Sequence, residues 1–179
     1  MNRRRLLALI GVCIAVPAIV AAAAAQSSVA PDAERVARVY TRAFFAGDVK
    51  TAADLTDPRT IERVRESFLS ELVKVTDPDA EKAILGDLGL ARTTAELSKV
   101  DGKTLYIAIT ERDLRKNPAA LEAMKRTHVE ILGSVSNPAG GVTVLVRTSA
   151  PMKDGVASKE SGLLMRRVLG DWKVVSNVP

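Results

Sequence analysis

The stretch "THVEILGSVS", residues 127–136, marks where the sequence changes from helical to strand-like patterns. From here on, β-branched residues dominate four segments, and turn-forming runs at residues 137–141, 153–155 and 170–171 separate them. Strands joined by such turns predict an antiparallel meander. Helical patterns fill the chain before it, so we expect an α+β fold in which N-terminal helices pack on this sheet.

Side chains alternate between the two faces of a strand, so the apolar set in each strand identifies the face that packs on the helices. Three of the four strands have such a set. The residues expected to face the core are Val129, Ile131, Gly133 and Val135, then Val142, Val144 and Val146, then Trp172 and Val174. His128, Glu130 and Arg147 are then expected on the opposite, outer face of the sheet.

The first half of the chain predicts helices separated by capping residues. In "RAFFAGDVKTAADL", residues 42–55, a glycine suits the end of one helix and Asp48 suits the N-cap of the next. Asp48 can also be interpreted as a catalytic carboxylate, but capping explains it without further assumptions. Asp57, Asp77 and Asn117 each precede a proline, and they predict three further helix starts.

The segment "DGKTLYIAITERDL", residues 101–114, is compatible with two structures. Asp101 and Gly102 form a hairpin signal, and the alternating apolar residues from Leu105 to Ile109 favour a strand. Alternatively, Asp101 caps a helix in which Leu105 and Ile109 lie about one turn apart. The local pattern favours the strand and leaves the helix open.

The N-terminus has the pattern of a secretory signal peptide. Arginines at residues 3–5 precede an apolar run that ends in an alanine tract at residues 21–25. We expect cleavage after Ala25 and a periplasmic or secreted protein that keeps no stable membrane span. One alternative is a retained anchor, against which the weakly hydrophobic alanine tract argues. Another is a lipoprotein signal at Cys13, which lacks the small preceding residue of such signals.

Removal of this leader, residues 1–25, changes both the charge and the cysteine content. The 179 residues carry a formal net charge of +5, which falls to +2 without the three leader arginines. Nucleic-acid binding therefore loses its main support. The single cysteine also leaves, so we expect no disulfide. Residues 26–179 have the length of one domain.

Three short motifs, "AFFAGD", "VEILGSV" and "GDWKVV", together with the order of elements, resemble the nuclear transport factor 2-like superfamily, whose fold is a cystatin-like α+β cone. The likeness is to its small secreted bacterial members without an assigned activity, and it spans roughly residues 31–178. It implies a curved sheet that wraps the first long helix, with an apolar pocket between them. It also implies a helix for residues 101–114, which we expect in preference to the strand.

We expect binding rather than catalysis. The sequence contains no phosphate loop, nucleophile elbow or dinucleotide fingerprint, and one histidine is insufficient for a metal site. We therefore name no catalytic residue, no metal and no cofactor. The alternative is a small-molecule isomerase or dehydratase of the same superfamily, which needs Glu160, Tyr40 or Asp48 to converge in one cavity.

The expected role is that of an exported, non-enzymatic binding domain for a small apolar ligand or an envelope protein partner. Apolar and aromatic residues from both the helical side and the sheet side are the candidates for lining its pocket. They are Tyr40, Phe44, Tyr106, Val129, Ile131, Val144 and Trp172.

The outer face of the sheet is not uniformly polar. Leu132, Leu145, Val175 and one of the neighbours Leu163 and Leu164 are expected to point outward. Clustered together, they form an apolar patch of the kind that monomers seldom leave uncovered. We therefore expect a homodimer through this face, with isolated surface leucines as the alternative.

Overall fold

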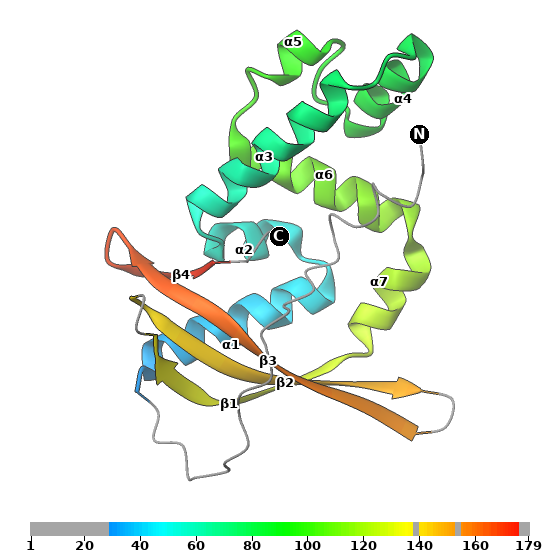
Figure 1. The fold of residues 1–179 in the computed structure, drawn as a ribbon. Coiled ribbons are helices and arrows are strands. Elements are labelled where there is room, and N and C mark those ends of the chain that lie inside the picture. The colour runs from blue at the N-terminus through cyan, green and yellow to red at the C-terminus, as the bar shows by residue number, and fades with distance from the viewer. Residues whose placement is uncertain (1–28, 138–139, 153–154, 176–179) are drawn as a thin grey trace.

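The computed structural model describes residues 29–137, 140–152 and 155–175, which form seven helices followed by four strands (Figure 1). The helices are α1 (Pro31–Ala46), α2 (Val49–Leu55), α3 (Pro58–Val73), α4 (Pro78–Leu88), α5 (Thr94–Leu97), α6 (Gly102–Lys116) and α7 (Pro118–Lys125). The strands are β1 (His128–Ser136), β2 (Val142–Met152), β3 (Gly155–Val168) and β4 (Asp171–Val175). The expected α+β fold is confirmed, and the predicted leader lies outside the described residues.

The four strands form an antiparallel meander in the order β1-β2-β3-β4, and α1 lies across one face of it (Figure 1). The small residues on the buried side of α1 allow the helix to approach the sheet closely. The buried residues of the helices and of the sheet form a first core cluster. Its buried members are Ala33, Ala37, Tyr40, Ala43 and Ala52 from the helices and Val142, Val144, Val146, Leu163, Met165 and Val174 from the sheet.

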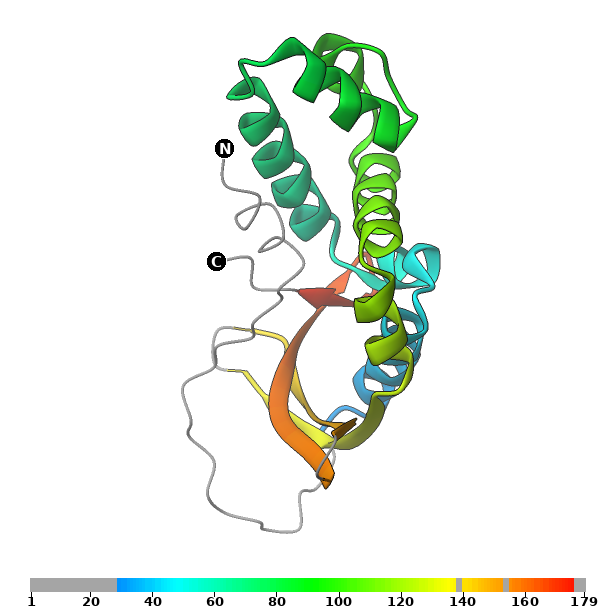
Figure 2. The ribbon, with the colours of Figure 1, turned by 90° about the vertical axis from the view of Figure 1, so that its right-hand side faces the viewer.

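The helices α3 to α6 build a second core cluster above the sheet. Figure 2 shows this group standing apart from the curved sheet, with α7 leading back down to β1. Its buried members lie at helical spacing on their own helices, so their apolar faces pack against one another. They are Phe68, Leu72, Leu85, Leu88, Leu97, Leu105 and Ile109.

The helix starts follow the capping residues in the sequence. The predicted caps all accept hydrogen bonds from amides in the first turn of a helix: Asp48, Asp57, Asp77 and Asn117. Asp101 does the same for α6, where its carboxylate lies 3.0 Å from the amide nitrogen of Thr104. The helix implied by the resemblance for residues 101–114 is confirmed. The locally favoured strand is wrong, because the cap and the burial of Leu105 and Ile109 both support a helix.

The strand β1 departs from strict alternation. Its register against β2 shifts at Leu132, which is the extra residue of a β-bulge. Beyond the bulge, Ser134 faces the core and is fully buried, whereas Val135 is 41% exposed. The expectation that Val135 faces the core is therefore wrong, although Gly133 is buried. The buried Ser134 hydroxyl accepts a hydrogen bond of 3.1 Å from the amide of Ala30, which fixes the start of α1.

Asp57 joins the helical half of the molecule to the sheet. One carboxylate oxygen accepts a 2.8 Å hydrogen bond from the amide of Arg59, and the other accepts from Nε of Arg166 on β3. The amide of Asp57 itself donates to the carbonyl oxygen of Val174 on β4, at 2.8 Å. Next to it, Thr56 forms an isolated parallel bridge with Val174. The chain between α2 and α3 is thus bound to the edge of the sheet.

The fold favours the ionised form of Asp57. Burial raises the pKa of this carboxyl, but the hydrogen bonds from Arg166 and the Arg59 amide outweigh burial, and so the pKa lies below its ordinary value. A lowered pKa in the folded state stabilises the protein above the unfolded value of about 4. That contribution is lost as the pH falls through the folded value.

Replacing the arginine of this pair is expected to destabilise the protein more than replacing the acid. Arg166→Gln leaves a buried carboxylate without its cation, so we expect the free energy of unfolding to fall by about 3 kcal/mol. Asp57→Asn keeps a capping side chain, and Arg166, whose side chain is 34% exposed, can turn to water. We expect a loss of about 1 kcal/mol there. Urea denaturation at neutral pH measures both values.

Arg147→Gln is the matched control for that comparison. Arg147 also bridges strands through carboxylates, but both of its ion pairs are exposed. The expected loss is below about 1 kcal/mol. The excess effect of Arg166→Gln should shrink as the pH falls below the unfolded value of about 4, because Asp57 then becomes protonated. Equal losses for the two arginine variants at neutral pH would show that burial gives this pair no special role.

Candidate functional site

The residues suggested by the sequence as a pocket lining pack mostly between α1 and the sheet. Six of the seven belong to the first core cluster or pack against it: Tyr40, Phe44, Val129, Ile131, Val144 and Trp172. The rings of Tyr40 and Phe44 are stacked, with centroids 6.0 Å apart. The seventh residue, Tyr106, is half-buried on α6. In this layer these side chains contact one another and stabilise the packing of α1 on the sheet.

Two tyrosines meet at Thr56, where α1, α2 and α6 come together. The Thr56 hydroxyl donates to the carbonyl oxygen of Ala52 at 2.8 Å and interacts with the hydroxyls of Tyr40 and Tyr106. Burial raises the pKa of Tyr40, and the nearby Tyr106 raises it further, against a smaller lowering by Thr56. Burial likewise raises the pKa of Tyr106. Both hydroxyls are therefore neutral at neutral pH.

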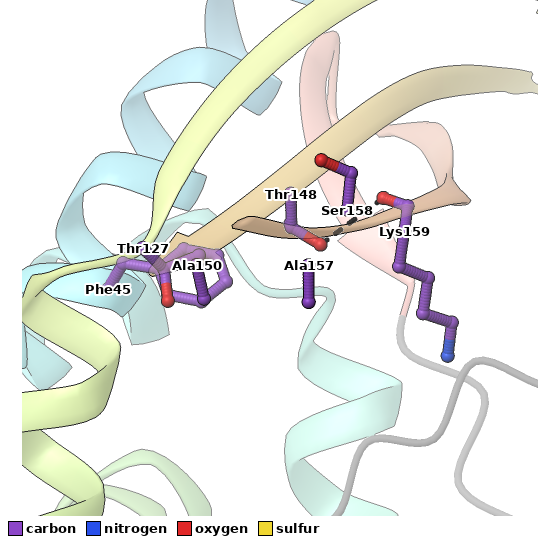
Figure 3. A pocket seen from close by; sticks show the side chains of 7 residues that line it. All are labelled: Phe45, Thr127, Thr148, Ala150, Ala157, Ser158 and Lys159. Carbon is purple, nitrogen blue, oxygen red and sulfur yellow. Dashed lines mark hydrogen bonds between the residues drawn. The ribbon is translucent and has the colours of Figure 1, made fainter. Parts of the chain in front are cut away.

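An open hollow of about 300 Å³ lies on the β2–β3 hairpin (Figure 3). We call it the hairpin hollow, and its lining residues are Phe45, Thr127, Thr148, Ala150, Ala157, Ser158 and Lys159. None of the seven residues suggested by the sequence lines it. Figure 3 shows Phe45, Thr127 and Ala150 together at one end and Lys159 at the other.

The hairpin hollow exists because β2 and β3 extend past the end of α1. Ala150 and Ala157 lie opposite each other in the hairpin, and by alternation they continue the sheet face that packs on α1. Phe45 is the last residue but one of α1, and its ring packs edge-on against Phe44 with centroids 5.3 Å apart. The helix thus covers the sheet as far as Phe45 and leaves the hairpin beyond it open.

The sequence contains two indications of this hollow, although our prediction missed Phe45 and Lys159. Successive residues of a helix lie about 100° apart, so adjacent Phe44 and Phe45 cannot both face one core layer. In addition, the first part of β3, "GVASKESG", lacks the apolar face that its second part has. A strand that is polar in its first half indicates a hairpin that extends beyond its covering helix.

The residues required by the enzymatic alternative lie in three separate places. Asp48 caps α2, with its carboxylate 3.1 Å from the amide nitrogen of Thr51. Glu160 lies on the outer face of the sheet, where it forms a 2.7 Å ion pair with Arg147. Tyr40 is buried in the first core cluster. These side chains share no cavity formed by the described residues.

The remaining candidates for a catalytic or metal site are unpaired buried polar atoms, the histidine and clusters of possible metal ligands. Among the described residues, two buried side-chain atoms have no hydrogen-bond partner, Glu34 Oε1 and Trp172 Nε1. His128 is exposed at the start of β1. No group of three or more His, Cys, Asp or Glu side chains in the described part of the chain could hold a metal ion. The described ionisable side chains mainly cap helices or form ion pairs.

Comparisons of this chain with protein-family models, with curated proteins and with solved structures give no match. Among the described helices, none has the length and apolar character needed to span a bilayer.

Tyrosine ionisation tests the packing at Thr56, because Tyr40 and Tyr106 are the two tyrosines of the chain. A raised folded pKa stabilises the protein below the unfolded value of about 10 and loses that contribution as the pH rises. We expect both tyrosines of the native protein to ionise at a higher pH than in concentrated urea, where they ionise around the ordinary value of about 10. Near-ultraviolet absorbance measures ionisation, and Tyr106→Phe assigns it. A native titration with half its amplitude near the ordinary value would instead place one hydroxyl in water.

Proposed function

We propose that this protein is a non-enzymatic binding domain and that the hairpin hollow is its binding site. The observation that carries the proposal is an open, largely apolar surface beside one cation. Phe45, Ala150 and Ala157 supply the apolar surface, and Lys159 forms no ion pair with any described residue. A volume of about 300 Å³ is at the lower end of the range for small-molecule sites. The hollow suits a small apolar ligand or the side chains of a protein partner.

The chemistry of the hollow favours binding over catalysis. Lys159 is the one ionisable side chain among the residues that line it, and it is exposed. Catalytic lysines lie in dry, enclosed sites, and Lys159 does not. The isomerase or dehydratase alternative needs an acid or a base inside the site. The nearest acid along β3, Glu160, is on the opposite face and already paired.

We also propose membership of the nuclear transport factor 2-like superfamily and export by the N-terminal leader. The packing of α1 on a four-stranded antiparallel meander supports the family, as does a helix over residues 101–114. The order of basic, apolar and alanine-rich segments in residues 1–25 supports export to the periplasm or beyond. On this proposal, the ligand or partner is encountered in the envelope or outside the cell.

A second surface favours self-association through the outer face of the sheet, which is the face opposite α1. One mainly apolar row crosses all four strands in register: Val135, Thr143, Leu164 and Val175. Leu145 lies in the next row, and Leu163 is buried under α1, so Leu164 is the outward member of that pair. A mainly apolar row supports a homodimer in which the same patch meets itself across a two-fold axis.

An apolar anionic dye, anilinonaphthalene sulfonate, tests the hairpin hollow. Its fluorescence is expected to rise on binding to the purified protein and to saturate at one dye per chain. Ala157→Trp fills the hollow with an indole ring and is expected to weaken binding by about tenfold or more. Val156→Trp is the matched control, since Val156 is the preceding residue, lies on the other face and is 70% exposed. Weaker binding in both variants, or in neither, would rule out the hollow as the site.

Sedimentation equilibrium at micromolar concentration tests the homodimer. We expect the mass of a dimer for the unchanged protein and the mass of a monomer for Leu164→Lys, because the new charge would be buried in the interface. Val73→Lys introduces the same charge at a 72% exposed valine at the end of α3 and should leave the dimer intact. A monomer mass for the unchanged protein would disprove the dimer.

A further inference from the structure

The two strands that pair with β3 differ greatly in length. β3 pairs with the whole of β2 through residues 155–165, but it pairs with β4 only from Leu164 to Val168. Within the described part of the chain, residues 155–163 therefore have no strand on their other side. We call this stretch the open edge of β3. Its residues 155–160 are all exposed.

An open edge of this kind is a template for another strand. Alternate residues of an antiparallel strand direct their N–H and C=O groups to the same side, so about half of the residues in the open edge present unpaired groups outward. An extended segment can satisfy these groups by adding as a further strand, and its alternate side chains then reach each face of the sheet. The hairpin hollow lies on one of those faces, directly beside the open edge.

We propose that the open edge of β3 binds an extended acidic segment of a partner protein as an added strand. The proposal rests on the function proposed above, and it names the partner of the same site. Lys159 supplies the charge preference, because it belongs to the open edge and points to the side of the hairpin hollow, as Ala157 does (Figure 3). On the outer face Glu160 is already neutralised by Arg147. The charge left for a partner is therefore the positive one.

A second copy of this chain is a poor occupant of the open edge. Two copies of β3 related by a two-fold axis would pair antiparallel. If the two-fold axis passes at Lys159, the two copies of Lys159 lie opposite each other. If it passes one residue further along, the two copies of Glu160 do. Like charges directly opposite each other destabilise a strand pair, and an inward-pointing lysine is a common protection of an edge strand against self-pairing. A partner strand with an acidic residue opposite Lys159 instead gains from the same lysine.

A synthetic peptide of the length of the open edge tests this proposal. The peptide is threonine-rich, with a central glutamate and a valine two residues to either side, so that the glutamate reaches Lys159 while a valine enters the hollow. We expect it to bind and to slow hydrogen exchange of the amides in residues 155–163. The same peptide with a central lysine should bind about fivefold more weakly. In Lys159→Glu this preference should reverse, whereas in Lys50→Glu, at an exposed site on α2, it should persist.

Main-chain pairing is tested by the same peptide carrying N-methyl groups throughout, which keeps every side chain and removes every amide donor. Loss of binding supports strand addition. Equal binding of the methylated peptide would overturn strand addition and keep the hollow as a side-chain site. Binding of the dye without binding of either peptide would also overturn strand addition and keep the hollow as a binding site. If neither the dye nor the peptides bind, the proposed function is rejected as well.

Two further outcomes would identify a different occupant of the open edge. Protection of residues 155–163 in the free protein that grows with protein concentration would assign the edge to a second copy. Tighter peptide binding by a chain shortened after Val175 would assign the edge to the C-terminal residues of this chain. Either result would overturn the partner strand.

Discussion

The contact of Asp57 with Arg166 and Val174 fixes how the two halves of this molecule meet. Asp57 begins α3, while its carboxylate is bound to β3 and its amide to β4. Such a buried carboxylate is tolerated only where hydrogen bonds and a cation compensate for lost hydration. This contact therefore fixes where α3 begins relative to the sheet. The second core cluster is formed by α3 together with α4, α5 and α6.

The same contact also determines which edges of the sheet stay open. Thr56 and Asp57 bind along the edge of β4 that faces away from β3. The chain between α2 and α3 therefore closes that edge of the sheet. β4 itself is only five residues long and leaves most of β3 without a neighbour on that side. Helix α1 ends before the tip of the β2–β3 hairpin and leaves that part of the hairpin uncovered. The open main-chain groups and the open apolar surface thus occur together on one hairpin.

Local chemistry made most helix starts predictable from the sequence, but two non-local features were not. Each cap depends on a side chain and the amides of the next few residues, so Asp48, Asp57 and Asp77 could be recognised one at a time. The bulge in β1 depends on how β2 pairs with it, and strict alternation therefore assigned Val135 to the core in place of Ser134. The hairpin hollow was not predicted for a similar reason, because the length of β3 beyond α1 is a relation between distant segments.

The distribution of ionisable groups supports the proposed binding role over the enzymatic alternative. The buried acid Asp57 is fully engaged in the junction, and the buried tyrosine Tyr40 is held neutral in the core. On the outer face, Arg147 is paired with two glutamates. Lys159 is exposed beside the apolar surface of the hairpin hollow. A site with one exposed cation and a mainly apolar lining can select an anionic or acidic ligand, but it offers no second group for proton transfer.

Intermolecular nuclear Overhauser effects between the bound dye and the methyl and ring protons of the protein can locate the bound dye. If binding occurs on the hairpin and outside the α1–sheet layer, we expect contacts from the dye to the ring of Phe45 and to the methyl groups of Ala150 and Ala157. Contacts to Val144 and Tyr40 in place of these would show that the ligand enters the layer between α1 and the sheet, and would refute binding on the hairpin.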